Sequence, residues 1–254
     1  MLTRLAKALL PERLRSELAW AKQSVRQGIA DRRETARHGA AWRQSRLGFP
    51  DSADPAAWYR LAEREFGICQ RPGEVCALIE RLREASPVTA GEIGVRDGGN
   101  SLLFIHALPS LQRYLGMDLQ VRNRAKLRYL ARDGMKAGFM DADSHHPCTP
   151  VKVERWLGGQ LFDLLFIDGD HRYEGVRRDF LDYGRLVRPG GLIAFHDICG
   201  GDASTEDEQP GQPWAGGVPR FWREIREQYE HVEFVEDWHQ TGFGIGLIVK
   251  PVDG

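Results

Sequence analysis

The sequence lacks any long apolar run. No stretch reaches the roughly eighteen consecutive apolar residues that a membrane-spanning helix needs. The N-terminal stretch also lacks the apolar centre and the small-residue cleavage site of a secretory signal. We therefore expect a chain that does not span a membrane and that lies in the cytoplasm.

Cysteine is scarce and widely spaced. The chain has 254 residues, 42% of them hydrophobic and 28% charged, which is ordinary for a globular protein. Structural zinc sites and disulfide frameworks need closely spaced cysteines. No Cys-X-X-Cys pair occurs among the four cysteines, so we expect free thiols; they are Cys69, Cys76, Cys148 and Cys199.

The chain has almost no net charge, but its charge is unevenly distributed. Residues 1–46 hold eleven Lys and Arg against four acidic residues, a net of +7, whereas the whole chain has a net of −1. Leucines recur along this segment at helical spacing on either side of a break near Pro11. The pattern predicts one or two amphipathic helices with a basic face.

Such an arm has three plausible uses. It could dock on its own domain, pack on a second copy in a homo-oligomer, or lie on an anionic membrane surface. Its basic residues are not interleaved with aromatic ones, so we do not expect nucleic-acid binding. The turn-forming residues of 48–55 indicate a joint. We thus expect a basic helical arm over 1–50 and a main domain over 51–254.

A strand, helix and strand unit lies at the centre of the main domain. An apolar run over 164–167 precedes Asp168-Gly-Asp-His171, and a second over 192–195 precedes His196 and Asp197. Between them, apolar residues at helical spacing predict a helix that ends at Pro189-Gly-Gly. Parallel strands joined in this way end at the same edge of a sheet, where open α/β sheets bind ligands.

A glycine-rich turn precedes this unit. The segment 87–95 predicts a strand that runs into Glu92-Ile-Gly94-Val-Arg-Asp-Gly-Gly-Asn-Ser101 and then a helix. Glycines allow a ligand to approach the backbone, and the following helix offers unpaired N–H groups. The turn lacks G-X-G-X-X-G spacing, which disfavours a nicotinamide cofactor. The next strand ends at Asp118, whose carboxylate could accept hydrogen bonds from two ribose hydroxyls.

The remaining segments complete a seven-stranded pattern. We expect a basic helix over 122–132, a third strand over 139–144 with Asp143 and Ser144 at its tip, a helix over 217–229, and strands over 232–235 and 243–249. The acidic, Gly/Pro-rich loop 200–217, with Trp214, is a candidate lid. The predicted fold is α/β, with a Rossmann-like, doubly wound sheet whose last strand is antiparallel.

These motifs, in this order, resemble those of class I S-adenosylmethionine-dependent methyltransferases over residues 72–250. The stretches FIDGDHRYEGVRRDF, RPGGLIAFHD and GVPRFW are similar to the macrocin O-methyltransferase and cephalosporin-hydroxylase-like group. The resemblance implies S-adenosylmethionine as cofactor. The residues implied to contact it are Glu92, Gly94, Ser101, Asp118, Asp143 and Ser144, with the last two near the adenine.

The same resemblance implies a divalent metal held by Asp168, His196 and Asp197. His196 departs from the carboxylate usual in those families, so a manganese ion would suit the position better than magnesium. Alternatively, His196 is not a ligand, or catalysis is metal-free. His171 is the candidate general base and acts beside Asp168. The competing interpretations are that Asp168 merely caps the next helix and that His171 binds the backbone.

The resemblance therefore implies O-methyl transfer to a hydroxyl of a small molecule, sugar or glycolipid. Two other functions remain open at this point. One is a nucleotide-fold oxidoreductase or hydroxylase-like enzyme, and the other is a non-catalytic, cofactor-binding partner protein.

Overall fold

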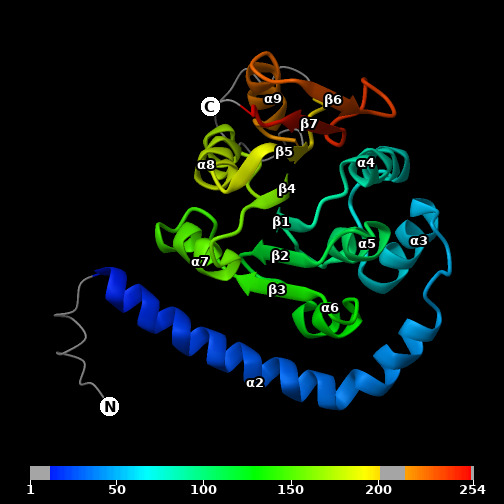
Figure 1. The fold of residues 1–254 in the computed structure, drawn as a ribbon, viewed down its shortest axis with the longest axis vertical. Helices are drawn as coiled ribbons and strands as arrows, with labels where there is room; N and C mark the ends of the chain where they lie inside the picture. Colours follow the sequence, from blue (N-terminus) through cyan, green and yellow to red (C-terminus); the bar gives the residue numbers. More distant parts are fainter. Residues whose placement is uncertain (1–11, 201–214, 253–254) are drawn as a thin grey trace.

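The computed structural model describes residues 12–200 and 215–252. Its centre is a seven-stranded sheet with strand order β3-β2-β1-β4-β5-β7-β6 (Figure 1). Strands β1 to β5 pair in parallel, and β7 is antiparallel to both β5 and β6, which confirms the predicted sheet. The strands are β1 Thr89–Ile93, β2 Arg113–Asp118, β3 Lys136–Asp141, β4 Phe162–Ile167, β5 Val187–His196, β6 His231–Phe234 and β7 Ile245–Val249.

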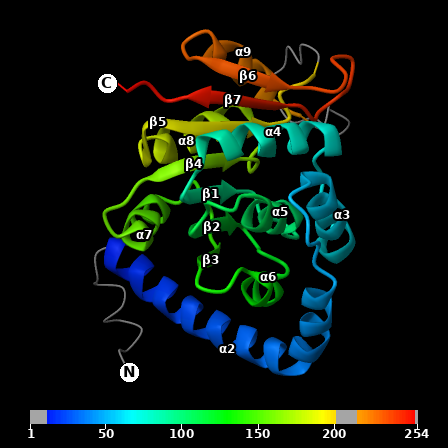
Figure 2. The ribbon, with the colours of Figure 1, turned by 45° about the vertical axis from the view of Figure 1, so that its right-hand side comes forward.

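Helices cover both faces of the sheet (Figure 2). A separate apolar core is buried on each face. In β5, Leu192 and Ala194 belong to one core and Ile193 and Phe195 to the other, because side chains alternate along a strand. The first core lies under α3 Pro55–Phe66, α4 Pro72–Ala85, α5 Gly99–Ala107 and α6 Arg124–Leu130, and the second under α7 Cys148–Leu157, α8 Tyr173–Gly184 and α9 Val218–Arg226.

The predicted arm is a single helix over the described residues, α2 Glu12–Leu47. It runs along α6 and reaches α7, beyond the β3 edge of the sheet (Figure 1). Trp42 is 8% exposed and packs against Tyr129 of α6, with ring centroids 5.6 Å apart. Residues 48–54 are not helical, as expected of a joint. No helix in the described part of the chain is long and apolar enough to cross a membrane.

The two boundaries predicted at Pro189-Gly-Gly are wrong. Helix α8 ends at Gly184, well before Pro189, because Val187 already pairs with Phe162 in the sheet. Pro189-Gly-Gly lies inside β5, where the register with β4 shifts and Gly190 has a φ of +68°. Proline offers no N–H to the ladder, so the strand bulges there instead of ending.

Strand β3 is also displaced from its predicted position. It begins at Lys136 and ends at Asp141, which pairs with Asp118 across the sheet. Asp143 and Ser144 therefore lie in the loop beyond the strand and not at its tip. The candidate lid falls largely on residues 201–214, which are outside the described residues, and Trp214 is among them.

Candidate functional site

Two connected cavities open at the carboxyl ends of the parallel strands. The first, of about 410 Å³, is lined by the glycine-rich turn after β1, by residues 67–70, and by Asp168, His196 and Asp197. The second, of about 730 Å³, is lined by residues 142–145 and 169–172. Residues common to both linings join the two cavities; they are Gly94, Asp118, Gly169 and His171.

The glycine-rich turn forms a close-packed wall of the first cavity. Gly94 has a φ of +98°, and a Cβ atom there would lie 1.9 Å from the carbonyl oxygen of Asp168. A Cβ atom on Gly99 would lie 2.0 Å from the carbonyl oxygen of Gly67. Only glycine permits these approaches. The side chain of Asn100 lies on the same wall, 6% exposed, and its buried Oδ1 has no hydrogen-bond partner within the described part of the chain.

Asp118 is held where the two cavities meet. Its Oδ2 accepts a hydrogen bond of 2.8 Å from the backbone N–H of Arg96, and its Oδ1 accepts one of 2.9 Å from that of Gln120. These bonds fix the carboxylate in one orientation while each oxygen keeps a free lone pair. The geometry suits binding of two vicinal hydroxyls.

Glu92 and Ser101 lie behind the cavity wall. Glu92 is 1% exposed and accepts hydrogen bonds from Asn100, Ser101 and Tyr114. Burial raises the pKa of Glu92 to about 7, although these hydrogen bonds oppose the shift. Neither Glu92 nor Ser101 lines either cavity, and the cofactor contact that the resemblance implied for them stays a prediction.

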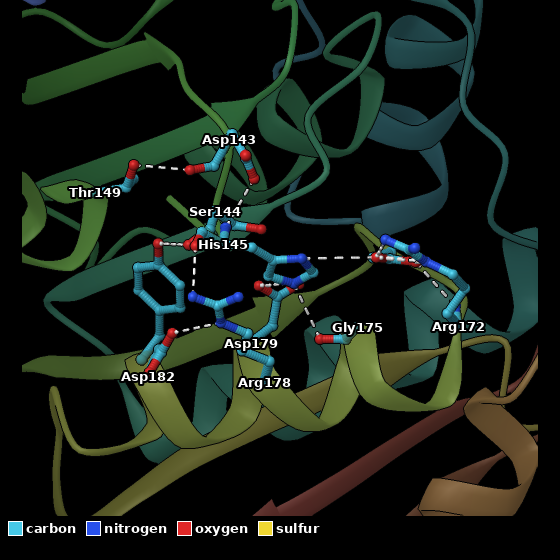
Figure 3. A network of polar contacts seen from close by, with 11 residues as sticks. Asp143, Ser144, His145, Thr149, Arg172, Gly175, Arg178, Asp179 and Asp182 are labelled. Atoms are coloured by element: carbon cyan, nitrogen blue, oxygen red, sulfur yellow. Dashed lines mark hydrogen bonds and ion pairs between the residues drawn. The ribbon is translucent and has the colours of Figure 1, made fainter. Parts of the chain in front are cut away.

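The loop after β3 forms the far wall of the second cavity and is tied to α8 (Figure 3). The carbonyl oxygen of Ser144 accepts a hydrogen bond of 2.7 Å from the Tyr183 hydroxyl. His145 Nε2 lies 3.2 Å from the buried carboxylate of Asp179. Asp143 Oδ1 accepts the backbone N–H of His145 at 2.9 Å. The fold thus brings Asp143 and Ser144 to the same cavity as Asp118.

Two carboxylates and two imidazoles converge in the first cavity. Asp168 comes directly after β4. His196 is the last residue of β5, and Asp197 follows it. His196 Nδ1 lies 3.2 Å from Asp168 Oδ1 and 3.3 Å from Asp197 Oδ2. His171 Nε2 lies 3.7 Å and 3.4 Å from the same two oxygens. The non-glycine residue Asp197 has a φ of +62°, a strained conformation of the kind found at functional sites.

The charges of this group are strongly coupled. Burial alone would lower the pKa of His196, but the carboxylates of Asp168 and Asp197 raise it well above its usual value. Burial alone would raise the pKa of Asp168, but the charge of His196 and hydrogen bonds from both histidines lower it. The two carboxylates therefore favour the protonated form of His196, and a cation bound beside it would compete with that proton.

Three residues of the group could hold a metal ion. One ligand atom from each of Asp168, His171 and Asp197 lies within 4.8 Å of the other two. The set differs from the one that the resemblance implied, since His171 takes the place of His196. Nitrogen and oxygen donors together suit manganese or iron better than magnesium.

Sequence reasoning missed Gln70. Its Nε2 donates a hydrogen bond of 2.7 Å to Asp168 Oδ2, and its side chain is 4% exposed. The Tyr59 hydroxyl donates to the Gln70 carbonyl oxygen at 3.0 Å, which anchors the segment to α3. Helix α3 was also missed, although Asp54 and Pro55 are an N-cap and first-turn pair visible in the sequence.

Comparison with known proteins bears directly on this site. Residues 92–198 match a family model described as a methyltransferase domain. This range contains the glycine-rich turn, Asp118, Asp143 and the cluster of Asp168, His171, His196 and Asp197. In sequence, a 35-residue stretch is 54% identical to the uncharacterized protein R132 of Acanthamoeba polyphaga mimivirus, and it spans 14% of this chain and 16% of that relative.

Several solved methyltransferases share the fold. The O-methyltransferase TomG of Streptomyces achromogenes, in complex with S-adenosylmethionine, is 20% identical, with a TM-score of 0.54 over 79% of this chain and 91% of that one. An O-methyltransferase of Bacillus cereus with S-adenosylhomocysteine is 15% identical, with a TM-score of 0.53 over 79% and 92%. MycE, with Mg, S-adenosylhomocysteine and mycinamycin VI, is 18% identical, with a TM-score of 0.54 over 80% and 56%. These similarities confirm the expected fold, which this chain shares with the methyltransferases compared.

Proposed function

We propose that the chain is an S-adenosylmethionine-dependent O-methyltransferase whose acceptor is a hydroxyl of a small molecule, sugar or glycolipid. The observation that carries the proposal is the junction of the two cavities. Asp118 lies there, and the cluster of Asp168, His171, His196 and Asp197 lies on the other side of Gly94. A nucleoside bound at Asp118 would thus have its reactive end beside ionisable side chains.

The second cavity and the glycine-rich turn fit the cofactor. Asp118 is oriented for the ribose hydroxyls, and the loop containing Asp143 and Ser144 closes the far end, where the adenine would lie. The unpartnered Asn100 Oδ1 offers an acceptor for the amino group of the methionine part. Glu92 supports this wall from behind by binding Asn100 and Ser101.

The first cavity fits a divalent cation and the acceptor. Asp168, His171 and Asp197 would hold the ion, and the mixed donor set favours manganese, although MycE binds Mg. Such an ion, when bound, polarises a hydroxyl as a Lewis acid. Gln70 and His196 hold the Asp168 carboxylate from two sides. In a metal-free reaction, the same carboxylates would orient His171 as the general base and stabilise its imidazolium.

Cofactor identity is tested by calorimetry. S-Adenosylhomocysteine should bind in the micromolar range, whereas NAD should not bind. Asp118→Ala should weaken binding by roughly 1 to 3 kcal/mol through lost ribose hydrogen bonds. Glu84→Ala, which removes a side chain that is 74% exposed, is the matched control and should bind normally. Tight NAD binding without a response to S-adenosylhomocysteine would refute the proposal.

The metal is tested by chelation. EDTA should abolish methyl transfer to a polyhydroxylated acceptor, and added Mn²⁺ should restore it. Asp197→Asn should leave S-adenosylhomocysteine binding intact while removing most turnover. Full turnover in excess EDTA would instead assign His171 as the base of a metal-free reaction.

A further inference from the structure

The helix α2 presents two different faces. Its inward face contains Asp31 and Trp42, each 8% exposed, which contact α6. Because a helix turns about 100° per residue, Leu18, Val25 and Ile29 lie on the far side of the helix from these two. Their exposed fractions are 39%, 63% and 39%. The far side thus carries an apolar stripe that the domain does not cover.

Basic residues flank this stripe. Among the side chains of the helix that the structure describes, the exposed cationic ones are Lys22, Arg26, Arg32, Arg33, Arg37 and Arg43. Between positions 18 and 47 the only acidic residues are Asp31, which is buried, and Glu34, which is half-buried. Asp31 already pairs with Arg124 and Arg128 of the domain. The exposed charge of this surface is therefore entirely positive.

We propose that this surface, the outer arm face, binds peripherally to an anionic phospholipid bilayer. The outer arm face consists of the apolar stripe at 18, 25 and 29 and the six flanking basic residues. Apolar side chains on such a helix enter the boundary between headgroups and acyl chains, while basic side chains meet lipid phosphates. An anionic bilayer would thus contact both the apolar stripe and the basic residues, and its negative charge is complementary to theirs.

Other partners use only one of these features. A second copy of the chain would cover the stripe, but it would bring two strongly cationic faces together, which costs free energy. A nucleic acid would neutralise the charge and leave the apolar stripe in water. An anionic bilayer satisfies both.

Helix α2 also passes near the proposed cofactor site. Ala19 and Gln23 of α2 line a small third cavity of about 250 Å³. Leu119, Ala142 and Asp143 line this cavity and the second cavity as well. A bilayer bound to the arm would therefore be adjacent to the methyltransferase site, independently of which acceptor that site takes.

Vesicle co-sedimentation of the full-length chain tests the proposal. The chain should pellet with vesicles of phosphatidylcholine that contain about one quarter phosphatidylglycerol and should stay in solution with phosphatidylcholine alone. A combined Leu18→Ser, Val25→Ser, Ile29→Ser variant should bind at least about tenfold more weakly. A combined Arg26→Gln, Arg33→Gln, Arg37→Gln variant should lose about tenfold to a hundredfold.

The controls change equally exposed residues elsewhere. Leu181→Ser, at a position 51% exposed, and Arg177→Gln should bind as the natural chain does. Circular dichroism and S-adenosylhomocysteine binding verify that each variant is folded, whether or not it methylates anything. No binding to anionic vesicles, or equal binding by the triple-serine variant, overturns the proposal. So does a dimer in light scattering that the triple-serine variant dissociates.

Discussion

Glu92 is a buried carboxyl group whose pKa lies close to neutral pH. Burial raises its pKa to about 7, against an ordinary value of 4.5. The folded state therefore binds more protons than the unfolded state between these values. The stability that this group contributes is complete below about pH 4.5 and is lost as the pH rises through about 7.

Replacing Glu92 with glutamine should remove this pH dependence. The amide keeps an acceptor for Ser101 and Tyr114 but does not ionise. Between about pH 5 and 8, the natural chain should lose up to roughly 3 kcal/mol more unfolding free energy than Glu92→Gln. Urea titrations across this range measure the difference, and Glu84→Gln, at an exposed position, should behave as the natural chain. Parallel curves for Glu92→Gln and the natural chain would mean that Glu92 does not titrate in this range.

Gln70 is expected to position Asp168. Its hydrogen bond fixes one carboxylate oxygen, so that the other faces the two histidines. Loss of a partner that orients a ligand typically costs about 10- to 100-fold in metal affinity or activity. Gln70→Leu should therefore lower Mn²⁺ affinity and kcat in this range while S-adenosylhomocysteine affinity changes little. Gln228→Leu, at an exposed position in the turn after α9, is the control, and normal Mn²⁺ affinity in Gln70→Leu would rule out the role.

For single residues, the sequence motifs indicated where in the fold a side chain lies. They did not indicate which other side chains it contacts. Asp118 ends β2, whereas Asp143, Asp168 and Asp197 follow the ends of β3, β4 and β5, and topology alone brings such ends to one edge. The environment of Glu92 depends on Tyr114, which is distant in sequence. Gln70 has no motif of its own, because it reaches Asp168 only through the packing of α3 and α4.

At the scale of elements, a connected series of polar contacts links the arm to the walls of the proposed cofactor site. Asp31 of α2 pairs with Arg124 of α6 through bonds of 3.1 Å and 2.9 Å. Arg124 also pairs with Asp141 at the end of β3, and Gln27 of α2 donates to the same carboxylate at 2.6 Å. Asp141 in turn accepts the backbone N–H of Val121, in the loop that follows Asp118.

Asp31→Asn should disturb this set. Removing one partner of a buried ion pair commonly costs about 3 to 5 kcal/mol, since the other charge stays buried. Because Arg124 then holds Asp141 less firmly, S-adenosylhomocysteine affinity should fall together with stability. Asp133→Asn breaks the arm's exposed pair with Arg46, where Asp133 is 92% exposed, and should cost under about 1 kcal/mol. Calorimetry and urea unfolding of both variants measure this, and equal effects would contradict the argument.

Element types were readable from the sequence, but several boundaries were not. Apolar runs located the central strands β1 and β4 within a few residues, because a strand buried on both faces is an apolar run. Pro189-Gly-Gly gives a strong turn signal locally, yet pairing with β4 overrides it and makes a bulge. Helix α7 was missed because it has few apolar residues; its buried side chains include only Pro150, Val153 and Leu157 among the apolar ones.

At the scale of the whole molecule, the arm completes the first core. That core contains Trp42 of α2 together with residues of α3 to α6, and the polar set around Arg124 closes the same face. The domain surface beneath α2 would therefore place Tyr129 and Arg124 in water if the arm were removed. Substitutions on the inward face of the arm should therefore lower the stability of the protein more than substitutions on the outer face, since only the inward face is part of the folded core.

Deleting residues 1–47 should accordingly destabilise the protein at both low and high salt. Salt screens exposed charges but leaves buried apolar contacts and buried ion pairs largely intact. Loss of about 3 kcal/mol would lower the melting temperature by roughly 6 to 12 °C in a chain of this size. The triple-serine variant of the outer arm face removes apolar groups without touching α6 and should melt with the natural chain. An unchanged melting temperature, mass and turnover in the truncated chain would show instead that the domain does not need the arm, and that its contacts with α6 contribute nothing measurable to folding.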